Sequence, residues 1–401
     1  MARKPQLWLW MGDVIYGDYK EMWALESYVP PFQFFRAAPP EMLQEKYILQ
    51  QANAGYAQLQ SQVPLIGVWD DHDFGRNDGD KTYPYREQSQ SLFLDFIGES
   101  AQSPRRHQEG VYASYVIGSG DRIVKFFLLD VRYNKDPYND AEDGDFLGEA
   151  QWEWFEREIA TSTAAFNVIV SGIQVLPTDR FFGEAENWHR FPKQRERLLG
   201  TLLRSSVRGV ILLSGDVHFA EINEIQCDEF QNLIVEVTSS GLTHSIDTSR
   251  NKLFGSLPQL IFRIANLILP WEFRPHHQQF FGGLNFGELA FNWEAHPEPT
   301  VTARVFDVDG SAQLEYTLSS RYFFENDGVQ RTPCRPIREE AAPLVFARRA
   351  IFVGIFGLVL ITIPIICMLA LGIVFVVFMR SFRLMRGLQR DLFDTEYQKI
   401  D

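Results

Sequence analysis

The feature that most restricts how this chain can fold is a run of about 30 residues near its C-terminus, Ala350 to Met379, with no charged side chain. A helix that spans the hydrocarbon core of a bilayer needs about 20 apolar residues, and a buried helix of a globular domain is usually shorter. The single proline in the run, Pro364, is tolerated in membrane helices. The run therefore predicts one transmembrane helix over residues 350–379.

This segment divides the rest of the chain. Residues 1–320 are expected to form one globular domain, 321–349 a polar linker and 380–401 a basic tail. The domain alternates short apolar runs with helical patterns, which favours an α/β fold. The apolar runs expected as strands are Leu7–Met11, Pro64–Trp69, Ile123–Leu129, Phe166–Val170 and Val210–Leu213. The helical patterns cover Glu45–Gln60, Glu149–Ile159 and Lys193–Leu203, and Asp309-Gly310 predicts a hairpin near the end of the domain.

Charge and cysteine content restrict the possible partners and cross-links. The formal net charge is −14, so we do not expect a nucleic-acid scaffold to be bound by general electrostatics. An acidic protein that handles an anion needs a local positive field, which metal ions supply. A disulfide between Cys227 and Cys334 is possible, although nothing in the sequence requires it.

Polar groups follow each of the five predicted strands, and the carboxyl ends of such strands are where ligands bind in α/β sheets. A single aspartate after a strand is usually a turn residue or a helix cap. The run Asp70-Asp71-His72-Asp73 is different, because three carboxylates and an imidazole resist burial unless a cation compensates them. A solvated acidic loop is the alternative. Asp216 and His218 add a second carboxylate–imidazole pair after the fifth strand.

The residue types indicate which metals such a site would bind. Carboxylates, imidazoles and a phenol, without a cysteine cluster, argue against a zinc–thiolate structural site and suit two hard or borderline cations, among Fe, Mn, Zn, Mg and Ca. Two such ions can bind phosphate oxygens, activate a water and stabilise a leaving oxygen.

The order of the motifs gives a family resemblance over about residues 5–295. The motifs are Leu9-Trp-Met-Gly-Asp-x-Ile-Tyr-x-Asp18, Trp69-Asp-Asp-His-Asp-x-Gly75 with Asn77-Asp78, Leu129-Asp-x-Arg132, Leu147-Gly-x-x-Gln151-Trp, Ser214-Gly-Asp-Val-His218 and Thr238-Ser-Ser-Gly-Leu-Thr243. Together they resemble the PhoD-like branch of the calcineurin-type metallophosphoesterases.

The resemblance implies a four-layer α/β/β/α sandwich with a two-metal site at the strand ends. The metal ligands that it implies are Asp13 (bridging both ions), Tyr16 as a phenolate, Asp71, Asp216 and His218. It also implies that His72 protonates the leaving oxygen. Arg132 is a candidate phosphate clamp, because a guanidinium binds two phosphate oxygens at once. A structural ion pair with a neighbouring carboxylate is the alternative for Arg132.

One departure from the family concerns the start of the chain. Family members begin with a strand that ends in a Ser-Cys-Asn-like segment and supplies the first metal ligand, whereas this sequence starts at what would be the second strand. Either the N-terminus is truncated, which we favour, or the protein lacks a ligand and a core strand. A missing strand would expose a sheet edge and apolar surface.

The expected function is hydrolysis of phosphate mono- or diesters by a single-pass membrane protein. One alternative is an inactive membrane protein that uses the fold as a binding module. Another is a phosphodiesterase acting on lipid head groups, motivated by the anchor and by the apolar segment Leu257–Pro270, which is either an interfacial helix or one packed on the domain. Basic residues after the membrane segment favour a cytosolic tail and a lumenal or extracellular catalytic domain; a tail-anchored enzyme with a cytosolic domain is the alternative.

Overall fold

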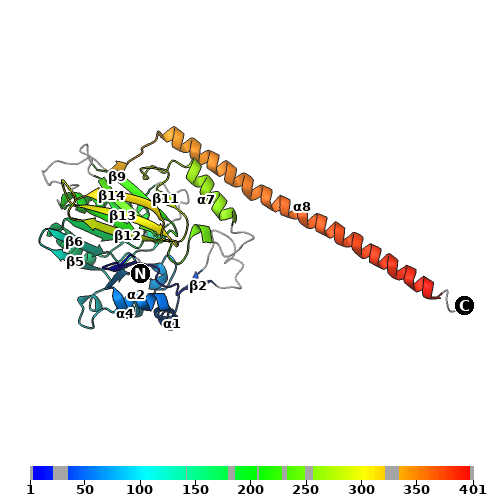
Figure 1. The fold of residues 1–401 in the computed structure, drawn as a ribbon, viewed down its shortest axis with the longest axis horizontal. Coiled ribbons are helices and arrows are strands. Elements are labelled where there is room, and N and C mark those ends of the chain that lie inside the picture. Colours follow the sequence, from blue (N-terminus) through cyan, green and yellow to red (C-terminus); the bar gives the residue numbers. More distant parts are fainter. Residues whose placement is uncertain are drawn as a thin grey trace. The chain divides into compact units, whose positions relative to one another are not determined.

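The structure is a computed structural model, and its chain divides into two compact units. It describes residues 3–20, 35–140, 142–178, 186–205, 207–227, 233–248, 256–320 and 334–397. One unit contains Met1–Gln259 and Trp271–Glu339, and the other contains Leu260–Pro270 and Glu340–Asp401. Figure 1 shows the elements of both units, which are described separately below.

The first unit contains a sheet of eight strands in the order β11-β9-β10-β8-β7-β6-β5, with β15 beside β9. The central strands β6, β7, β8 and β10 run parallel, and β5 and β9 flank them antiparallel. Their bounds are β5 Ala113–Ser119, β6 Arg122–Leu128, β7 Phe166–Val170, β8 Val210–Ser214, β9 Ala220–Gln226, β10 Leu233–Ser239, β11 Phe280–Phe281 and β15 Arg335–Pro336. Every residue of β7 and β8 is buried, because a parallel strand is covered on both faces. The carboxyl ends of the parallel strands therefore meet at one edge.

Three smaller sheets complete the strands of this unit. β1 (Trp8–Met11) pairs in parallel with β4 (Leu65–Val68). β12 (Asn285–Asn292), β13 (Thr300–Asp307) and β14 (Ala312–Ser319) form an antiparallel sheet that contains the predicted hairpin. β2 (Tyr19–Lys20) and β3 (Phe35–Arg36) form a short ribbon. Of these pairs, β1–β4 joins segments far apart in the sequence and brings the end of β1 to that of β4.

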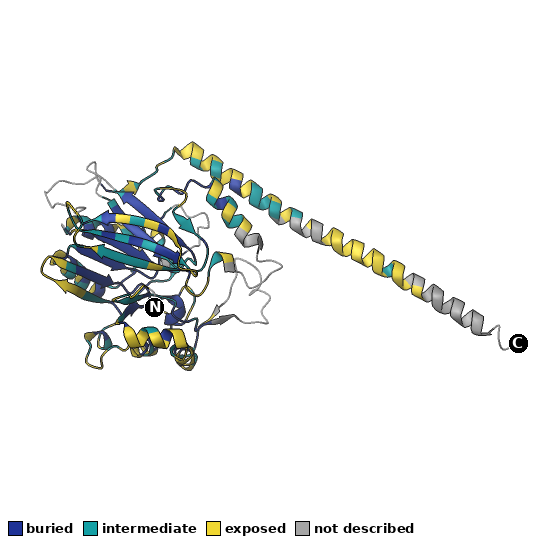
Figure 2. Cartoon of the chain, viewed as in Figure 1, coloured by how far each residue is buried: buried dark blue, intermediate teal, exposed yellow. Residues whose placement is uncertain are grey.

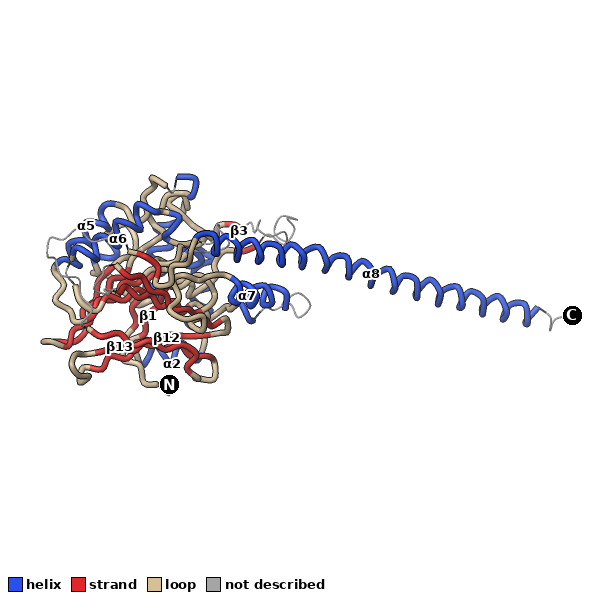
Figure 3. Tube along the Cα trace, turned by 90° about the horizontal axis from the view of Figure 1, so that it is seen from above, coloured by secondary structure: helices blue, strands red, loops and turns tan. Residues whose placement is uncertain are grey.

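Two hydrophobic cores lie on opposite faces of the large sheet. Figure 2 shows much of this sheet in the dark blue of buried residues. On one face, Phe127 and Leu212 pack in a cluster with Trp152 of α5 (Glu149–Ala160) and Leu198 of α6 (Pro192–Arg204). Figure 3 shows these two helices together on one side of the strands. The other face belongs to a cluster with β1, β4, β13 and the helices α1 (Pro40–Gln51), α2 (Ala54–Gln62) and α4 (Arg86–Phe96). Both faces of the sheet are therefore covered, as a parallel sheet requires.

The one long helix predicted over Glu45–Gln60 is wrong, because two helices, α1 and α2, occupy this region. Asn53 lies between them, and its side chain accepts hydrogen bonds from the backbone N–H groups of Gly55 and Tyr56. An asparagine that caps a new helix in this way competes with continuation of the preceding one.

The second unit consists of α8 (Ala342–Tyr397) and most of α7 (Ser256–Ile268). Ala342–Val359 is long and apolar enough to cross a membrane by length and composition. α8 begins inside the predicted linker and continues through most of the predicted tail, while residues 321–333 of that linker lie outside the described residues. Within this unit the Arg348 guanidinium donates to the carbonyl of Ile268 at 3.4 Å.

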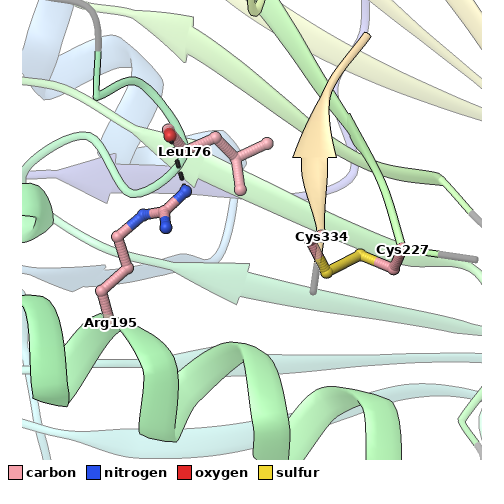
Figure 4. The surroundings of a disulfide bond; sticks show 4 residues. All are labelled: Leu176, Arg195, Cys227 and Cys334. Carbon is pink, nitrogen blue, oxygen red and sulfur yellow. Dashed lines mark hydrogen bonds between the residues drawn. A yellow bond between two sulfur atoms is a disulfide. The ribbon is translucent and has the colours of Figure 1, made fainter. Parts of the chain in front are cut away.

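A disulfide joins Cys227 to Cys334 across 107 residues (Figure 4). Cys227 follows β9, and Cys334 precedes β15, whose Arg335 pairs with Gln226 of β9. The cross-link and the strand pairing therefore fix the chain that leaves the first unit to the edge of its large sheet.

Candidate metal site

The ends of β1 and β8 bring their polar residues together through unusual backbone conformations. Asp13 follows β1 with φ 51°, and Asp216 and His218 follow β8 with φ 71° and 59°. Among the described residues six non-glycine residues have positive φ, and these three and Asp78 are four of them. Such conformations cost about 1–3 kcal/mol each and persist only where the surroundings enforce them. The concentration of these conformations in the loops after the strands indicates a functional site at the strand ends.

Two glycines allow the loops to approach Asp70, which begins the short helix α3 (Asp71–Phe74). A Cβ on Gly12 would lie 2.4 Å from the Cβ of Asp70, and a Cβ on Gly172 would lie 2.6 Å from Asp70 Oδ1. Neither distance is possible for real side chains. Glycine at both positions therefore lets the ends of β1, β4 and β7 converge around one carboxylate.

Carboxylates from three strand ends converge at this point. Oxygens of Asp70, Asp71 and Asp216 lie within 4.8 Å of one another, and so do ligand atoms of Asp13, Asp71 and His72. The two groups share Asp71 and are therefore adjacent. The structure thus brings Asp13, Asp71, His72 and Asp216, all singled out in the sequence, into one cluster.

The electrostatics of the cluster indicate what would occupy it. Burial and the charges of Asp71 and Asp70 raise the pKa of Asp13 well above its usual range, and burial and the charge of Asp70 do the same for the pKa of Asp216. Burial raises the pKa of Asp70 to about 7 against the opposing charge of Arg132. In the part of the chain that the structure describes, Asp13 Oδ1 and Asp70 Oδ2 are buried without a hydrogen-bond partner. A cation among these oxygens would remove the repulsion and supply the missing partner.

Tyr16 and His218 extend the cluster beside Asp13. The Tyr16 hydroxyl lies 3.3 Å from Asp13 Oδ2 and 3.1 Å from His218 Nε2. Burial and the neighbouring His244 and His72 lower the pKa of His218 to about 4, so its imidazole is neutral and able to bind a metal. The ring of His244 lies 4.3 Å from that of Tyr16, centroid to centroid. The donor set of carboxylate, phenol and imidazole fits a hard or borderline cation.

His72 is held by a carboxylate outside the cluster. Its Nδ1 lies 2.5 Å from Asp18 Oδ1, and the other oxygen of Asp18 accepts the backbone N–H of Asn77 at 2.9 Å. Burial would lower the pKa of His72, but the charge of Asp71 and the hydrogen bond to Asp18 outweigh it and raise the pKa to about 9. His72 is therefore oriented and protonated at neutral pH.

Arg132 lies in a buried ion-pair network. Its Nε lies 2.5 Å from Asp70 Oδ1, and a terminal nitrogen lies 2.5 Å from Glu186 Oε2. Lys135 contacts the other oxygen of Glu186 at 3.2 Å. Burial alone would raise the pKa of Glu186, but the charges of Arg132 and Lys135 lower it to about 2. This is the ion pair that the sequence left open as the alternative for Arg132.

The sequence does not distinguish the roles of the aspartates in the run Asp70-Asp71-His72-Asp73. Asp73, in the same run, accepts the backbone N–H of Ile15 at 3.0 Å, so it fixes the loop after β1. Asp70, by contrast, points into the cluster and was not among the predicted ligands. Asp78 and Glu186 form a further acidic group with Asp71. Asp78 stood in a quoted motif, whereas Glu186 follows no predicted strand and carried no signal.

Comparisons with known proteins identify the family of this chain. The family model described as PhoD-like phosphatase matches residues 1–272. The chain belongs to the PhoD-like phosphatase family. Alkaline phosphatase D of Bacillus subtilis (strain 168) is 24% identical over 193 residues, which cover 41% of this chain and 33% of that protein. The resemblance read from the strand-end motifs is thereby confirmed.

A solved structure of PhoD shows that the fold is shared. It matches with a TM-score of 0.54 at 16% identity and covers 84% of this chain and 66% of that one. The chain thus spans about a third of the curated relative and just under two thirds of the solved structure. The α/β fold class is confirmed.

Proposed function

We propose that this protein is a membrane-anchored hydrolase of phosphate mono- or diesters that uses two metal ions at the strand ends. The observation that carries the proposal is the pair of adjacent ligand groups that share Asp71, one with Asp13 and His72 and the other with Asp70 and Asp216. Two cations held by adjacent groups would bind and polarise a phosphate ester and generate a nucleophile from water.

The residues divide between the two ions. Tyr16 and His218 would hold the first ion with one oxygen of Asp13, because the Asp13 carboxylate and the His218 imidazole both lie within 3.3 Å of the Tyr16 hydroxyl. Asp71 and Asp216 would hold the second. The unpartnered Oδ1 of Asp13 supports its role as the bridge between them. Asp70 joins the predicted ligand set as a further oxygen donor.

His72 would act on the ester directly, whereas Arg132 would act through a metal ligand. The hydrogen bond from His72 to Asp18 keeps the imidazole charged and oriented, so it can give a proton to the leaving oxygen. Arg132 was expected to bind phosphate, but its contacts with Asp70 and Glu186 support a different role, in which it fixes the Asp70 carboxylate. Arg132 is then a positioning residue for the second ion.

The fold proposed for the first unit is the four-layer α/β/β/α sandwich. The two cores on opposite faces of the large sheet support it, since one contains α5 and α6. The other contains the β1–β4 pair and the β12–β14 sheet together with α1, α2 and α4. The metal site would then lie where strand ends from both sheets meet.

The location proposed for the catalytic unit is the lumenal or extracellular side of the membrane. The disulfide between Cys227 and Cys334 supports this side, because disulfides persist in oxidising compartments and are rare in the cytosol. The anchor is α8, whose apolar part is long enough to cross a bilayer.

The test is hydrolysis of a chromogenic phosphate monoester and diester by the full chain in detergent, before and after a chelator removes the metals. Asp13→Asn and His218→Ala should abolish activity, since each removes a ligand. Asp121→Asn and His107→Ala, both at exposed positions, are the matched controls and should retain it. Metal binding by the wild-type chain without turnover of either ester would instead favour the binding-module alternative.

A further inference from the structure

The helix α7 is apolar on nearly all sides. Between Leu260 and Pro270 the sequence has only two polar side chains, those of Arg263 and Asn266. A helix that is hydrophobic all round lies in the core of a large domain or in a membrane. Neither hydrophobic core of the first unit includes a described residue of this segment, and the segment groups with α8 in the second unit. The cores of the first unit therefore do not account for its composition.

One side of α7 packs against the first turns of α8. Ala265 and Leu269, which are one helical turn apart, are buried, and so is Phe352 of α8. The Arg348 guanidinium donates to the carbonyl of Ile268 at the C-terminal end of α7. Figures 1 and 3 both show α7 next to the start of α8. This end of α7 is therefore held near the point where the charge-free run of α8 begins, two residues after Arg348.

The opposite side of α7 exposes leucines. Leu260 is 48% exposed and Leu267 is 80% exposed, and Arg263 lies exposed between them. These three positions share one face of the helix, because they are three and four residues apart. At 100° per residue, this face points away from Ala265 and Leu269. Water solvates such leucines poorly, whereas the acyl chains of a bilayer would cover them.

The length of the apolar run in α8 leaves room for α7 at the membrane surface. As a helix, the charge-free run of about 30 residues is about 45 Å long, whereas the hydrocarbon core of a bilayer is about 30 Å thick. About ten residues of the run therefore extend beyond the core, at the level of the lipid head groups. Because α7 packs at one end of the run, it lies at this level when the other 20 or so residues cross the bilayer.

We propose that α7 is a second membrane contact, which lies at the head-group level beside α8 and inserts Leu260 and Leu267 among the acyl chains of the lipid. The bilayer is the occupant of this face because α7 packs on a helix that itself exposes apolar side chains, such as Ile351 and Val353. The Arg263 side chain would extend along the apolar face and bring its guanidinium to a lipid phosphate. The proposal rests on the membrane anchor proposed above but not on ester hydrolysis.

An inserted α7 would restrain the first unit more than α8 alone does. The segment Leu260–Pro270 interrupts the sequence of the first unit, since Gln259 and Trp271 on either side belong to that unit. The chain therefore passes between the two units at both ends of this segment, as well as at Glu339-Glu340 before α8. Insertion of α7 would thus tether the first unit to the membrane at two further points of its chain.

The test is the membrane depth of spin labels on the full chain in vesicles of phosphatidylcholine and phosphatidylglycerol. Cys367→Ser removes the cysteine outside the disulfide, and Leu260→Cys, Leu267→Cys, Leu371→Cys and His107→Cys are then made one at a time at exposed positions. Collision of the label with oxygen, which dissolves in lipid, is compared with collision with a nickel chelate, which stays in water. The two labels on α7 should lie about 5–10 Å below the lipid phosphates. The label on α8 should lie deeper, and the label on the first unit should lie in water.

Three results would overturn the proposal, and they differ in what else they affect. Full access of the nickel chelate to both labels on α7, with the label at Leu371 in lipid, would place α7 in water and leave the anchor intact. Protection of the α7 labels from oxygen as well as from nickel would show that protein, such as a second copy of the chain, covers this face. A label at Leu371 in water would remove the anchor on which the proposal rests. None of these results bears on ester hydrolysis.

Discussion

Replacing Gly172 with alanine tests whether the Asp70 carboxylate belongs to the metal site. The new Cβ would lie 2.6 Å from Asp70 Oδ1, whereas ordinary contacts begin at 3.4 Å, so one of the two must move by about 0.8 Å. Asp70 is fully buried and its Oδ1 is held by Arg132 at 2.5 Å, so movement breaks that contact. Ligating groups must be held within about 0.5 Å of their working positions, and this displacement exceeds that tolerance.

We expect Gly172→Ala to weaken metal binding by about 10–100-fold, the range for loss of a group that orients a ligand. The overpacking should also destabilise the fold by about 1–3 kcal/mol. Competition with a chromophoric chelator gives the metal affinity, and urea unfolding gives the stability. Asp70→Asn, which keeps the shape of the side chain, should lose metal affinity without the steric cost.

Gly200→Ala in α6 is the matched control. Its Cβ would approach the far end of the flexible Arg204 side chain, which can move. The substitution should stabilise the helix by about 0.5–1 kcal/mol and leave metal binding unchanged. Wild-type metal affinity in both Gly172→Ala and Asp70→Asn would refute the placement of Asp70 in the site.

Three further substitutions test the network, the disulfide and the phenol. Glu186→Gln removes the buried negative charge that Arg132 and Lys135 share and should destabilise the protein by about 3–5 kcal/mol in urea unfolding. Glu149→Gln, which breaks an exposed pair, should cost less than about 1 kcal/mol. Equal costs would contradict the buried network. Cys227→Ser should cost about 2–4 kcal/mol under oxidising conditions and nothing under reducing ones, because a loop of 107 residues is no longer closed. Tyr16→Phe should lower the bound metal by one ion in elemental analysis, and an unchanged metal content would exclude the phenol as a ligand.

The parallel strands were predicted well because the apolar run that indicates each of them lies within the strand itself. β7 matches its predicted bounds, and the other four predicted strands differ by one residue or so at their ends. Buried parallel strands read as continuous apolar runs, and their short length and the polar turn residues that follow them favour strands over helices. β9 and β10 were missed because charged residues interrupt them, and their burial depends on partners such as Arg274, which pairs with Glu221 of β9 at 2.7 Å.

The candidate site was predictable where ligands follow strands. Asp13 and Asp71 follow the paired strands β1 and β4, so strand pairing brings these two together. Asp216 follows β8 of the large sheet and joins them where the ends of the two sheets meet. Glu186 was not predictable, because its position beside Arg132 depends on a loop path that no local pattern encodes. The sequence allowed two roles for Arg132, a phosphate clamp or a partner in an ion pair. Only its burial among carboxylates in the structure distinguishes these roles.

The central claim is that two metal ions lie among these side chains, and anomalous X-ray scattering from crystals of the full chain tests it most directly. Data collected on either side of the absorption edge of each metal found by elemental analysis would locate the ions. We predict two peaks about 3.5–4 Å apart, with Asp13 bonded to both, Tyr16 and His218 to one, and Asp71 and Asp216 to the other. A single peak, or peaks that do not contact Asp13, would contradict the two-metal phosphoesterase.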